Sequence, residues 1–187
     1  MRALLLIDLS KDFIHLDGAL TCGQPGLDII PYCTTLVRDF LQRGEPVLDA
    51  RDEHDAEDVE IASKLFPPHN MRGTDGQALI DELRLELETV PELWHQIFKK
   101  HYNAGYQTRL FDLIRTLDID ELHIIGVCTD ICVRYTVNGL YEFKTTSYPN
   151  LRLVVHSGGV TSFNAVGHVD SLAHFALAFG VEVVHGT

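Results

Sequence analysis

The sequence predicts one α/β domain, residues 1–187, in which a mainly parallel β-sheet is covered by helices on both faces. Short apolar runs alternate along the chain with segments of helical spacing, a pattern typical of parallel sheets. The first run, Arg2 to Ile7, is apolar without alternation, as expected for a strand buried on both faces. A hydrophobic fraction of 45% over 187 residues is sufficient for a core of this kind.

Six strands are predicted, and each is a short apolar run bounded by charged or turn-forming residues. In chain order, the expected strands are 2–7, 45–50, 92–98, 121–125, 151–155 and 181–184. We find no internal repeat, low-complexity tract or linker between them, which favours a single domain.

Helices are predicted between these strands, where apolar residues recur every three or four positions. The expected helices are 28–42, 78–87, 108–117, 132–141 and 170–179. Gly44 and Gly180 follow two of them and are predicted to end them. The long polar segment from Asp55 to Gly76 contains Pro67-Pro68-His69, and we expect a functional loop there.

Composition and charge argue against several classes of protein. The formal net charge of −12 disfavours binding to a nucleic-acid backbone or an anionic membrane. No apolar run approaches the ~20 residues of a membrane span, and the N-terminal run ends at Asp8 without a signal-peptide cleavage site. The four cysteines lack disulfide-framework or zinc-ribbon spacing, so we expect a protein of the reducing cytoplasm.

Cys132 is the first candidate for a reactive residue. It follows the predicted strand 121–125 and falls in the first turn of the next helix, for which Thr129 and Asp130 are predicted to supply the N-cap. Free N–H groups and the helix dipole favour a thiolate at such a position and can hold an oxyanion. The alternative is that Cys132 is a small buried apolar residue, which is the commoner role of an isolated cysteine.

Four further polar residues also lie at or just after predicted strand ends. They are Asp8, Asp52, His54 and Lys99. Because ligand crevices form at the carboxyl ends of parallel strands, we expect these residues to meet near Cys132. Taken alone, two of these residues also have a non-catalytic interpretation. Asp8 could cap a loop, and Lys99 could be a solvated surface lysine.

Together these residues predict hydrolysis by a cysteine nucleophile. Asp8 can accept the Cys132 proton, and Lys99 keeps the carboxylate ionised and favours the thiolate. The backbone N–H groups of Cys128 and Cys132 are the expected oxyanion donors. Asp8 can then protonate a leaving amine and activate the water that hydrolyses the thioester.

A second group predicts a metal site. Asp52, His54 and His69 offer a carboxylate and two imidazoles without a thiolate, a set that suits a divalent ion such as zinc, iron or manganese. The alternative is a surface Asp-x-His pair and an unrelated histidine.

Five segments resemble the isochorismatase-like cysteine hydrolases and, within them, the nicotinamidases. They follow the family's order and cover essentially the whole chain: Leu6-Ile-Asp8-Leu-Ser-Lys-Asp-Phe13, Asp52-Glu-His54, Ser63-Lys-Leu-Phe-Pro-Pro-His69-Asn, Lys99-Lys-His-Tyr102-Asn-Ala and Gly126-Val-Cys-Thr-Asp-Ile-Cys132-Val. The resemblance implies a six-stranded Rossmann-like sheet in three α/β/α layers. It also implies a cis peptide bond between Val127 and Cys128.

The same resemblance implies roles for individual residues. The matching positions are Asp8, Lys99 and Cys132 for the catalytic triad, and Asp52, His54 and His69 for three metal ligands. Phe13 and Tyr102 lie in matching segments and are expected to contact substrate. In nicotinamidases the metal binds the pyridine nitrogen and orients the amide toward the cysteine.

Three positions depart from the family pattern. Ala62 stands where some relatives carry a glutamate as a fourth metal ligand, and we predict that Glu60 replaces it, with Glu57 or water as alternatives. Gly105 stands where the family usually has phenylalanine, so we expect one wall of the substrate pocket to differ. Cys128 replaces alanine or leucine, which leaves its backbone N–H unaffected.

The sequence therefore predicts a nicotinamidase reaction, in which nicotinamide is hydrolysed to nicotinate and ammonia through a Cys132 thioester. The alternatives are a related amidase for a carbamoyl or pyrazine amide, a non-catalytic scaffold, and a thiol redox protein using Cys128 and Cys132. We expect one divalent ion per chain, Zn²⁺ with Fe²⁺ or Mn²⁺ as alternatives. The expected partners are a small-molecule amide and further copies of the chain in a homo-oligomer, with no nucleic acid and no membrane.

Overall fold

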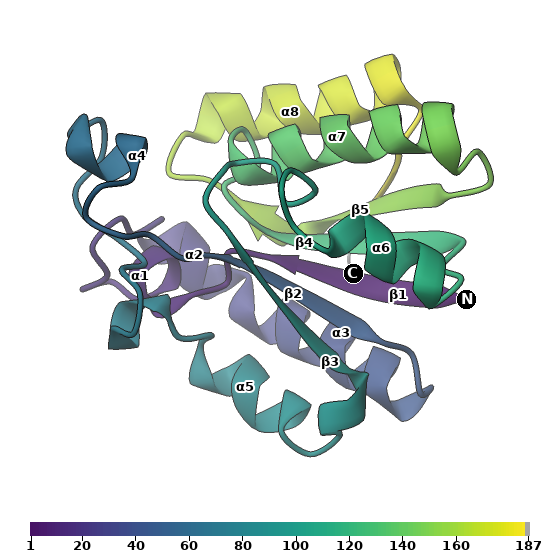
Figure 1. The fold of residues 1–187 in the computed structure, drawn as a ribbon, viewed down its shortest axis with the longest axis horizontal. Helices are drawn as coiled ribbons and strands as arrows, with labels where there is room; N and C mark the ends of the chain where they lie inside the picture. The colour runs from purple at the N-terminus through teal and green to yellow at the C-terminus, as the bar shows by residue number, and fades with distance from the viewer. Residues whose placement is uncertain (186–187) are drawn as a thin grey trace.

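The computed structural model describes residues 1–185 and contains one six-stranded sheet (Figure 1). All neighbouring strands are parallel, in the order β3-β2-β1-β4-β5-β6. The strands are β1 (Arg2–Ile7), β2 (Val47–Asp52), β3 (Trp94–Lys99), β4 (Glu121–Val127), β5 (Arg152–Thr161) and β6 (Glu182–Val184). The predicted Rossmann-like α/β architecture with six strands is confirmed.

Helices cover both faces of this sheet in three layers (Figure 1). One face carries α3 (Ile30–Gln42) and α5 (Asp81–Leu87), and the other carries α6 (Leu110–Thr116), α7 (Cys132–Ser147) and α8 (Ala165–Phe179). No helix among residues 1–185 combines the length and the apolar character that a membrane crossing requires.

The side chains of β1 show how the sheet joins two cores. Successive residues of a strand point to opposite faces. Leu4 and Leu6 therefore pack with α3 and α5, whereas Leu5 and Ile7 pack with α6 and α7. All four side chains are fully buried, which explains the unbroken apolar run.

Some element boundaries differ from prediction. β5 has ten residues and runs to Thr161, beyond the predicted end at Val155, and α8 begins five residues earlier than predicted. The extension of β5 contains Gly158 and Gly159, which carry no apolar signal. An added β-carbon at Gly159 would lie 2.5 Å from the side chain of Ile125, so close packing requires this glycine, whereas one at Gly158 would make a tight contact of 3.3 Å with the ring of Tyr32.

Short helices also lie in the segment after β1 and in the predicted loop 55–76. α1 (Lys11–Ile14) and α2 (Gln24–Asp28) follow β1, α4 (Val59–Ala62) lies within 55–76, and the 3₁₀ turn η1 (Asp75–Gln77) lies at the end of that loop. A further 3₁₀ turn, η2 (Pro91–Leu93), precedes β3. Helices of three to five residues are too short to show a helical period, which explains why the sequence did not reveal them.

Candidate active site

The carboxyl ends of four neighbouring strands bring the predicted reactive residues together. Asp8 follows β1, Asp52 and Lys99 end β2 and β3, and Cys132 begins α7 after β4. All four residues are buried, and ligand atoms of Asp8, Asp52 and Cys132 lie within 4.8 Å of one another. The expected convergence at one edge of the sheet is therefore observed.

A lysine joins the two carboxylates. Lys99 Nζ lies 2.7 Å from Asp8 Oδ2 and 2.5 Å from Asp52 Oδ1, and the Asp52 N–H donates to Asp8 Oδ1 at 2.8 Å. Burial lowers the pKa of Lys99, but Asp52 and Asp8 outweigh it and hold the pKa well above its ordinary value. The ammonium group is thus a fixed positive charge between them.

The two carboxylates differ in proton affinity. Burial and the nearby Asp52 raise the pKa of Asp8 to about 6, although Lys99 lowers it. Burial also opposes ionisation of Asp52, but Lys99 and His54 prevail and lower its pKa. Asp8 can therefore receive a proton near neutral pH while Asp52 remains charged, a division typical of acid–base sites.

The surroundings of Cys132 favour the thiol over the thiolate, contrary to our expectation of a favoured thiolate. Burial raises the pKa of Cys132 well above its ordinary value, and the lowering effect of Lys99 does not compensate. A hydrogen bond between the Cys132 thiol and Asp8 contributes to the pKa values of both groups. This geometry suits proton transfer to Asp8 during attack.

The turn between β4 and α7 presents free N–H groups. The Val127–Cys128 peptide bond is cis, as the resemblance implies. Within the described residues, neither the Cys128 nor the Cys132 N–H donates a hydrogen bond to the backbone or to a side chain. Both groups can therefore hold an oxyanion near the thiol.

The predicted N-cap for α7 is wrong. Ile131 occupies the cap position and makes no side-chain cap bond. Thr129 Oγ1 instead bonds His168 Nδ1 at 2.9 Å, and Asp130 Oδ1 accepts from Ser162 at 2.6 Å. These side chains connect the turn to α8, through His168, and to the segment before it, through Ser162.

Cys128 does not pair with Cys132. Its Sγ lies 3.6 Å from Cys22 Sγ, and all four cysteines are free thiols. The spatial partner of Cys128 therefore lies 106 residues away, which removes the geometric basis for a Cys128–Cys132 redox pair.

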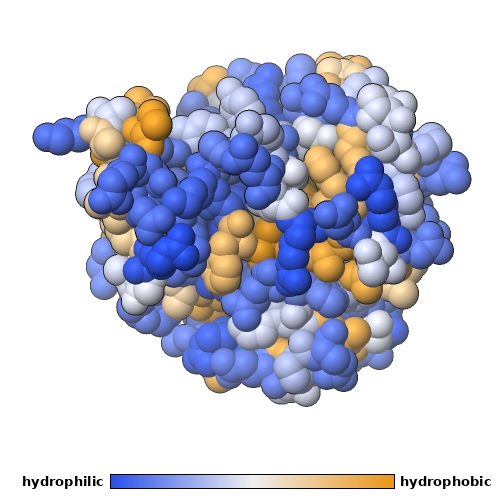
Figure 2. Space-filling model, viewed as in Figure 1, coloured by the Kyte–Doolittle hydropathy of each residue, from blue (hydrophilic) through white to orange (hydrophobic). Residues whose placement is uncertain are grey.

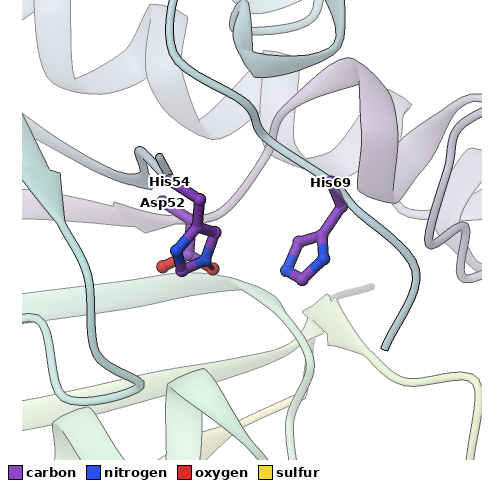
Figure 3. A group of neighbouring side chains, drawn as sticks. All are labelled: Asp52, His54 and His69. Atoms are coloured by element: carbon purple, nitrogen blue, oxygen red, sulfur yellow. Dashed lines mark ion pairs between the residues drawn. The ribbon is translucent and has the colours of Figure 1, made fainter. Parts of the chain in front are cut away.

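Asp52, His54 and His69 form a compact group at the end of β2 and in the loop that follows (Figure 3). Their ligand atoms lie within 4.8 Å of one another, and all three side chains are buried. The two imidazoles and the carboxylate point toward a common centre (Figure 3).

Hydrogen bonds prepare both imidazoles for metal binding. His69 Nδ1 donates to the Pro67 carbonyl at 2.8 Å, and His54 Nδ1 lies 3.4 Å from Asp58 Oδ2. A proton on each Nδ1 leaves a lone pair on each Nε2. His54 Nε2 is buried without a hydrogen-bond partner in the described chain, which is costly unless another group binds it.

Glu60 lies at the same group. Its Oε1 is 3.8 Å from His69 Nε2, and burial raises the pKa of its carboxyl. Ala62 and Glu57 are exposed, so Glu60 is the better placed carboxylate. Two imidazoles and two carboxylates fit a divalent ion of the zinc, iron or manganese type.

A small cavity separates the thiol from this group. Phe13 and Tyr102, the residues expected to contact substrate, line it together with Asp52, Glu60, His69, Cys128 and Cys132. Sequence reasoning missed four other lining residues, Leu20, Phe66, Ile131 and Phe163. Phe66 and Ile131 had a signal, since they lie inside the Phe-Pro-Pro-His segment and the Gly126-to-Val133 segment, respectively.

The cavity is small. Its volume of about 20 Å³ is about what one water molecule needs. A larger hollow of about 700 Å³ lies beside it and shares Glu60 and Tyr102 as walls. A ring-sized ligand can enter only if the side chains between the two spaces move.

Gly105 does not line either space, so the expected change in a pocket wall is wrong. An added β-carbon at Gly105 would lie 2.2 Å from the ring of Phe111. The glycine is therefore explained by packing against α6.

A buried cysteine, aspartate and lysine at the carboxyl ends of a parallel sheet are typical of a cysteine hydrolase. The chain belongs to the isochorismatase family, because the Isochorismatase domain matches residues 2–185. It is an amidohydrolase of the type represented by nicotinamidases and pyrazinamidases.

Three relatives place the chain within this family. The isochorismatase family protein PncA of Bacillus subtilis is 40% identical over 187 residues, covering 97% of this chain and 98% of PncA. The crystal structure of nicotinamidase/pyrazinamidase PncA from Bacillus subtilis superposes with a TM-score of 0.89 at 36% identity and 98% coverage of both chains. N-carbamoylsarcosine amidase from Thermoplasma acidophilum gives a TM-score of 0.82 at 27% identity, covering 98% of this chain and 95% of that one.

The pyrazinamidase of Pyrococcus horikoshii, whose crystal structure is a complex with zinc, is more distant. It gives a TM-score of 0.84 at 22% identity and covers 99% of both chains, a similarity that shows the fold alone.

Proposed function

We propose that the protein hydrolyses nicotinamide to nicotinate and ammonia through a thioester on Cys132. The observation that carries the proposal is one small cavity lined both by Cys132, whose thiol lies beside Asp8, and by Asp52 and His69 of the metal-type group. Aromatic side chains line the space between them, as suits a flat ring that carries an amide.

The first half-reaction forms the thioester. Asp8 accepts the Cys132 proton while the sulfur attacks the amide carbon, and the N–H groups of Cys128 and Cys132 stabilise the resulting oxyanion. Asp8 then returns this proton to the amide nitrogen, the C–N bond breaks, and ammonia leaves. Lys99 stabilises the ionised form of Asp8 before each transfer.

The second half-reaction releases the acid. Asp8, ionised again, takes a proton from a water molecule that attacks the thioester carbonyl. The C–S bond breaks, nicotinate leaves, and the Asp8 proton returns to Cys132 sulfur. One carboxylate thus serves both halves, for which a pKa near the working pH is suitable.

Asp52, His54, His69 and Glu60 are the residues that would hold one divalent ion. When bound, such an ion supplies a Lewis-acidic centre that can hold the lone pair of a substrate ring nitrogen. Zinc is our preferred ion, since the ligand set suits it, and iron and manganese remain alternatives.

An assay of ammonia release from a panel of small amides tests this proposal. We expect nicotinamide to be among the best substrates and chelator to reduce its hydrolysis. Full activity in chelator would contradict the metal role. A marked preference for N-carbamoyl amides would favour the alternative suggested by the similarity to N-carbamoylsarcosine amidase.

A further inference from the structure

The segment that carries His69 is held by few bonds of its own. α4, which precedes it, forms a lobe that projects from the body of the molecule (Figure 1, Figure 2). Within the described chain, no main-chain N–H or C=O of residues 65–69 makes a hydrogen bond, apart from the Pro67 carbonyl that accepts from the His69 ring. The His69 side chain is nevertheless buried, with its ring centroid 5.1 Å from that of His54. Residues outside this segment must therefore hold it in place.

Asn70, the next residue, is bonded on three sides. Its N–H donates to Asp12 Oδ2 at 2.7 Å, and its C=O accepts from the His54 N–H at 3.0 Å. Its side-chain oxygen accepts from Ser10 Oγ at 2.9 Å, and both of these side chains are fully buried. Asn70 therefore joins the loop of His69 to His54 and to the segment after β1.

The segment after β1 is a firm anchor for these bonds. Ser10 occupies the N-cap position of α1, and its carbonyl accepts from the N–H groups of Phe13 and Ile14 at 3.2 and 3.0 Å. The other carboxylate oxygen of Asp12 accepts from the Ala19 N–H at 3.2 Å. Unlike residues 65–69, this segment is thus fastened by its own hydrogen bonds.

The choice of asparagine at position 70 indicates a role beyond stability. Its φ is +45°, in the left-handed region that asparagine adopts more readily than most residues and that glycine adopts without cost. The amide Nδ2 is buried without a hydrogen-bond partner in the described chain, which costs free energy that glycine would avoid. The bond to Ser10 is what the asparagine side chain gains in return, and an aspartate there would add a negative charge beside Asp12.

We propose that Asn70 is a positioning residue for the two imidazoles of the candidate metal site, and that it acts through its bond to Ser10. Because these imidazoles would hold the divalent ion, this role rests on the proposed function. The bond fixes the backbone at position 70, and with it the adjacent His69 and the N–H of His54. Without it, an ion would have to order its own ligands, at a cost to its affinity.

Zinc affinity tests the proposal without relying on hydrolysis. The full chain is stripped of metal, and Zn²⁺ binding is measured in competition with a chromogenic chelator. Asn70→Gly keeps the left-handed turn but removes the bond to Ser10, and it should bind Zn²⁺ about 10–100-fold more weakly, the range typical of losses around metal ligands. For the same reason it should raise KM for nicotinamide more than it lowers kcat.

Ser10→Ala distinguishes the bond from the flexibility of a glycine. It removes the other partner of the same bond and leaves the backbone at position 70 unchanged, so zinc binding should weaken to a similar extent. The double variant Ser10→Ala, Asn70→Gly should bind about as weakly as either single variant, because all three lose one and the same interaction.

Tyr32→Phe is the matched control. It removes one hydrogen bond of 2.7 Å, from Tyr32 to His156, which also joins segments far apart in the sequence but lies outside the site. A loss of thermal stability can be common to all the variants, whereas the loss of zinc affinity should be confined to those at Ser10 and Asn70.

Parental zinc affinity in Asn70→Gly, additive losses in the double variant, or an equal loss in Tyr32→Phe would overturn the proposal and leave the metal site standing. A parent chain that binds no Zn²⁺ would overturn the metal site itself, and this positioning role with it.

Discussion

The polar groups on the two sides of the cavity, the thiol side with Cys132 and the imidazole side with His54 and His69, are paired in different ways. On the thiol side, Lys99 contacts both Asp8 and Asp52, so the charges balance within the chain. On the imidazole side, His54 Nε2 is buried without a hydrogen-bond partner in the described chain, and its ion-pair contact, Asp52 Oδ2, lies 3.8 Å away, compared with 2.7 Å between Lys99 and Asp8. The difference indicates that the thiol side is preorganised by the protein alone, whereas the imidazole side requires a cation or a ligand. This difference supports the proposal that bonds are broken on the first side and that the substrate is positioned on the second.

The largest effect is expected on the thiol side. Cys132→Ala removes the nucleophile with little change in volume, and hydrolysis should fall by roughly 10³-fold or more while the fold is kept. Ammonia release and circular dichroism would measure the two properties. Activity within tenfold of the parent would contradict the thioester mechanism.

Asp8→Asn should be similarly damaging, because one carboxylate is base, acid and water activator in turn. The amide keeps the shape of the side chain but cannot accept the Cys132 proton. Single-turnover kinetics should show that thioester formation itself is slowed, and normal thioester formation would remove Asp8 from the first half-reaction.

Lys99→Ala should also be severe, since it leaves two buried carboxylates without their positive partner. We expect the pKa of Cys132 to rise further, since Lys99 is the group that lowers it. The rate of Cys132 alkylation against pH would report this. An unchanged pH profile would exclude Lys99 from the mechanism.

Changes on the imidazole side should be smaller and should affect binding. His54→Ala should raise KM for nicotinamide at least about 10–100-fold, the range typical of losses around metal sites, with a lesser effect on kcat. Glu60→Gln should lower metal occupancy, measured by elemental analysis, if Glu60 is a ligand. Parental occupancy in that variant would indicate that water takes its place.

The smallest effect on activity is expected for Cys128→Ala. Its backbone N–H makes no hydrogen bond within the described chain and is the proposed oxyanion donor, whereas its thiol contacts Cys22. Parental kcat/KM in this variant would agree with a backbone role, and a large loss would revive a redox role for the thiol.

The sequence was sufficient to predict that the proposed catalytic residues lie close together. It was not sufficient to predict their pKa values. Apolar runs that end in Asp8, Lys99 and the Cys132 turn, together with the carboxyl-end rule for parallel sheets, predicted which residues meet. The raised pKa of Cys132 was missed, because burial of the thiol depends on the packed cavity and outweighs Lys99.

Other parts of the site depend on contacts between distant segments. Leu20 and Phe163 line the cavity from loops that have no periodic pattern, and Asp58 contacts His54 from the turn before α4. Thr129 and Asp130 have the residue types of a helix cap, but tertiary partners occupy their side chains. Local sequence rules describe a segment in isolation and do not include such partners.

Equilibrium binding of nicotinamide to the Cys132→Ala variant, before and after treatment with chelator, tests the division between the two sides most directly. The variant cannot turn over, so calorimetry would measure the imidazole side alone. Our account predicts clear binding by the metal-loaded variant and a loss of about 10–100-fold after chelation, restored by added Zn²⁺. Binding that is equally strong in chelator would contradict it.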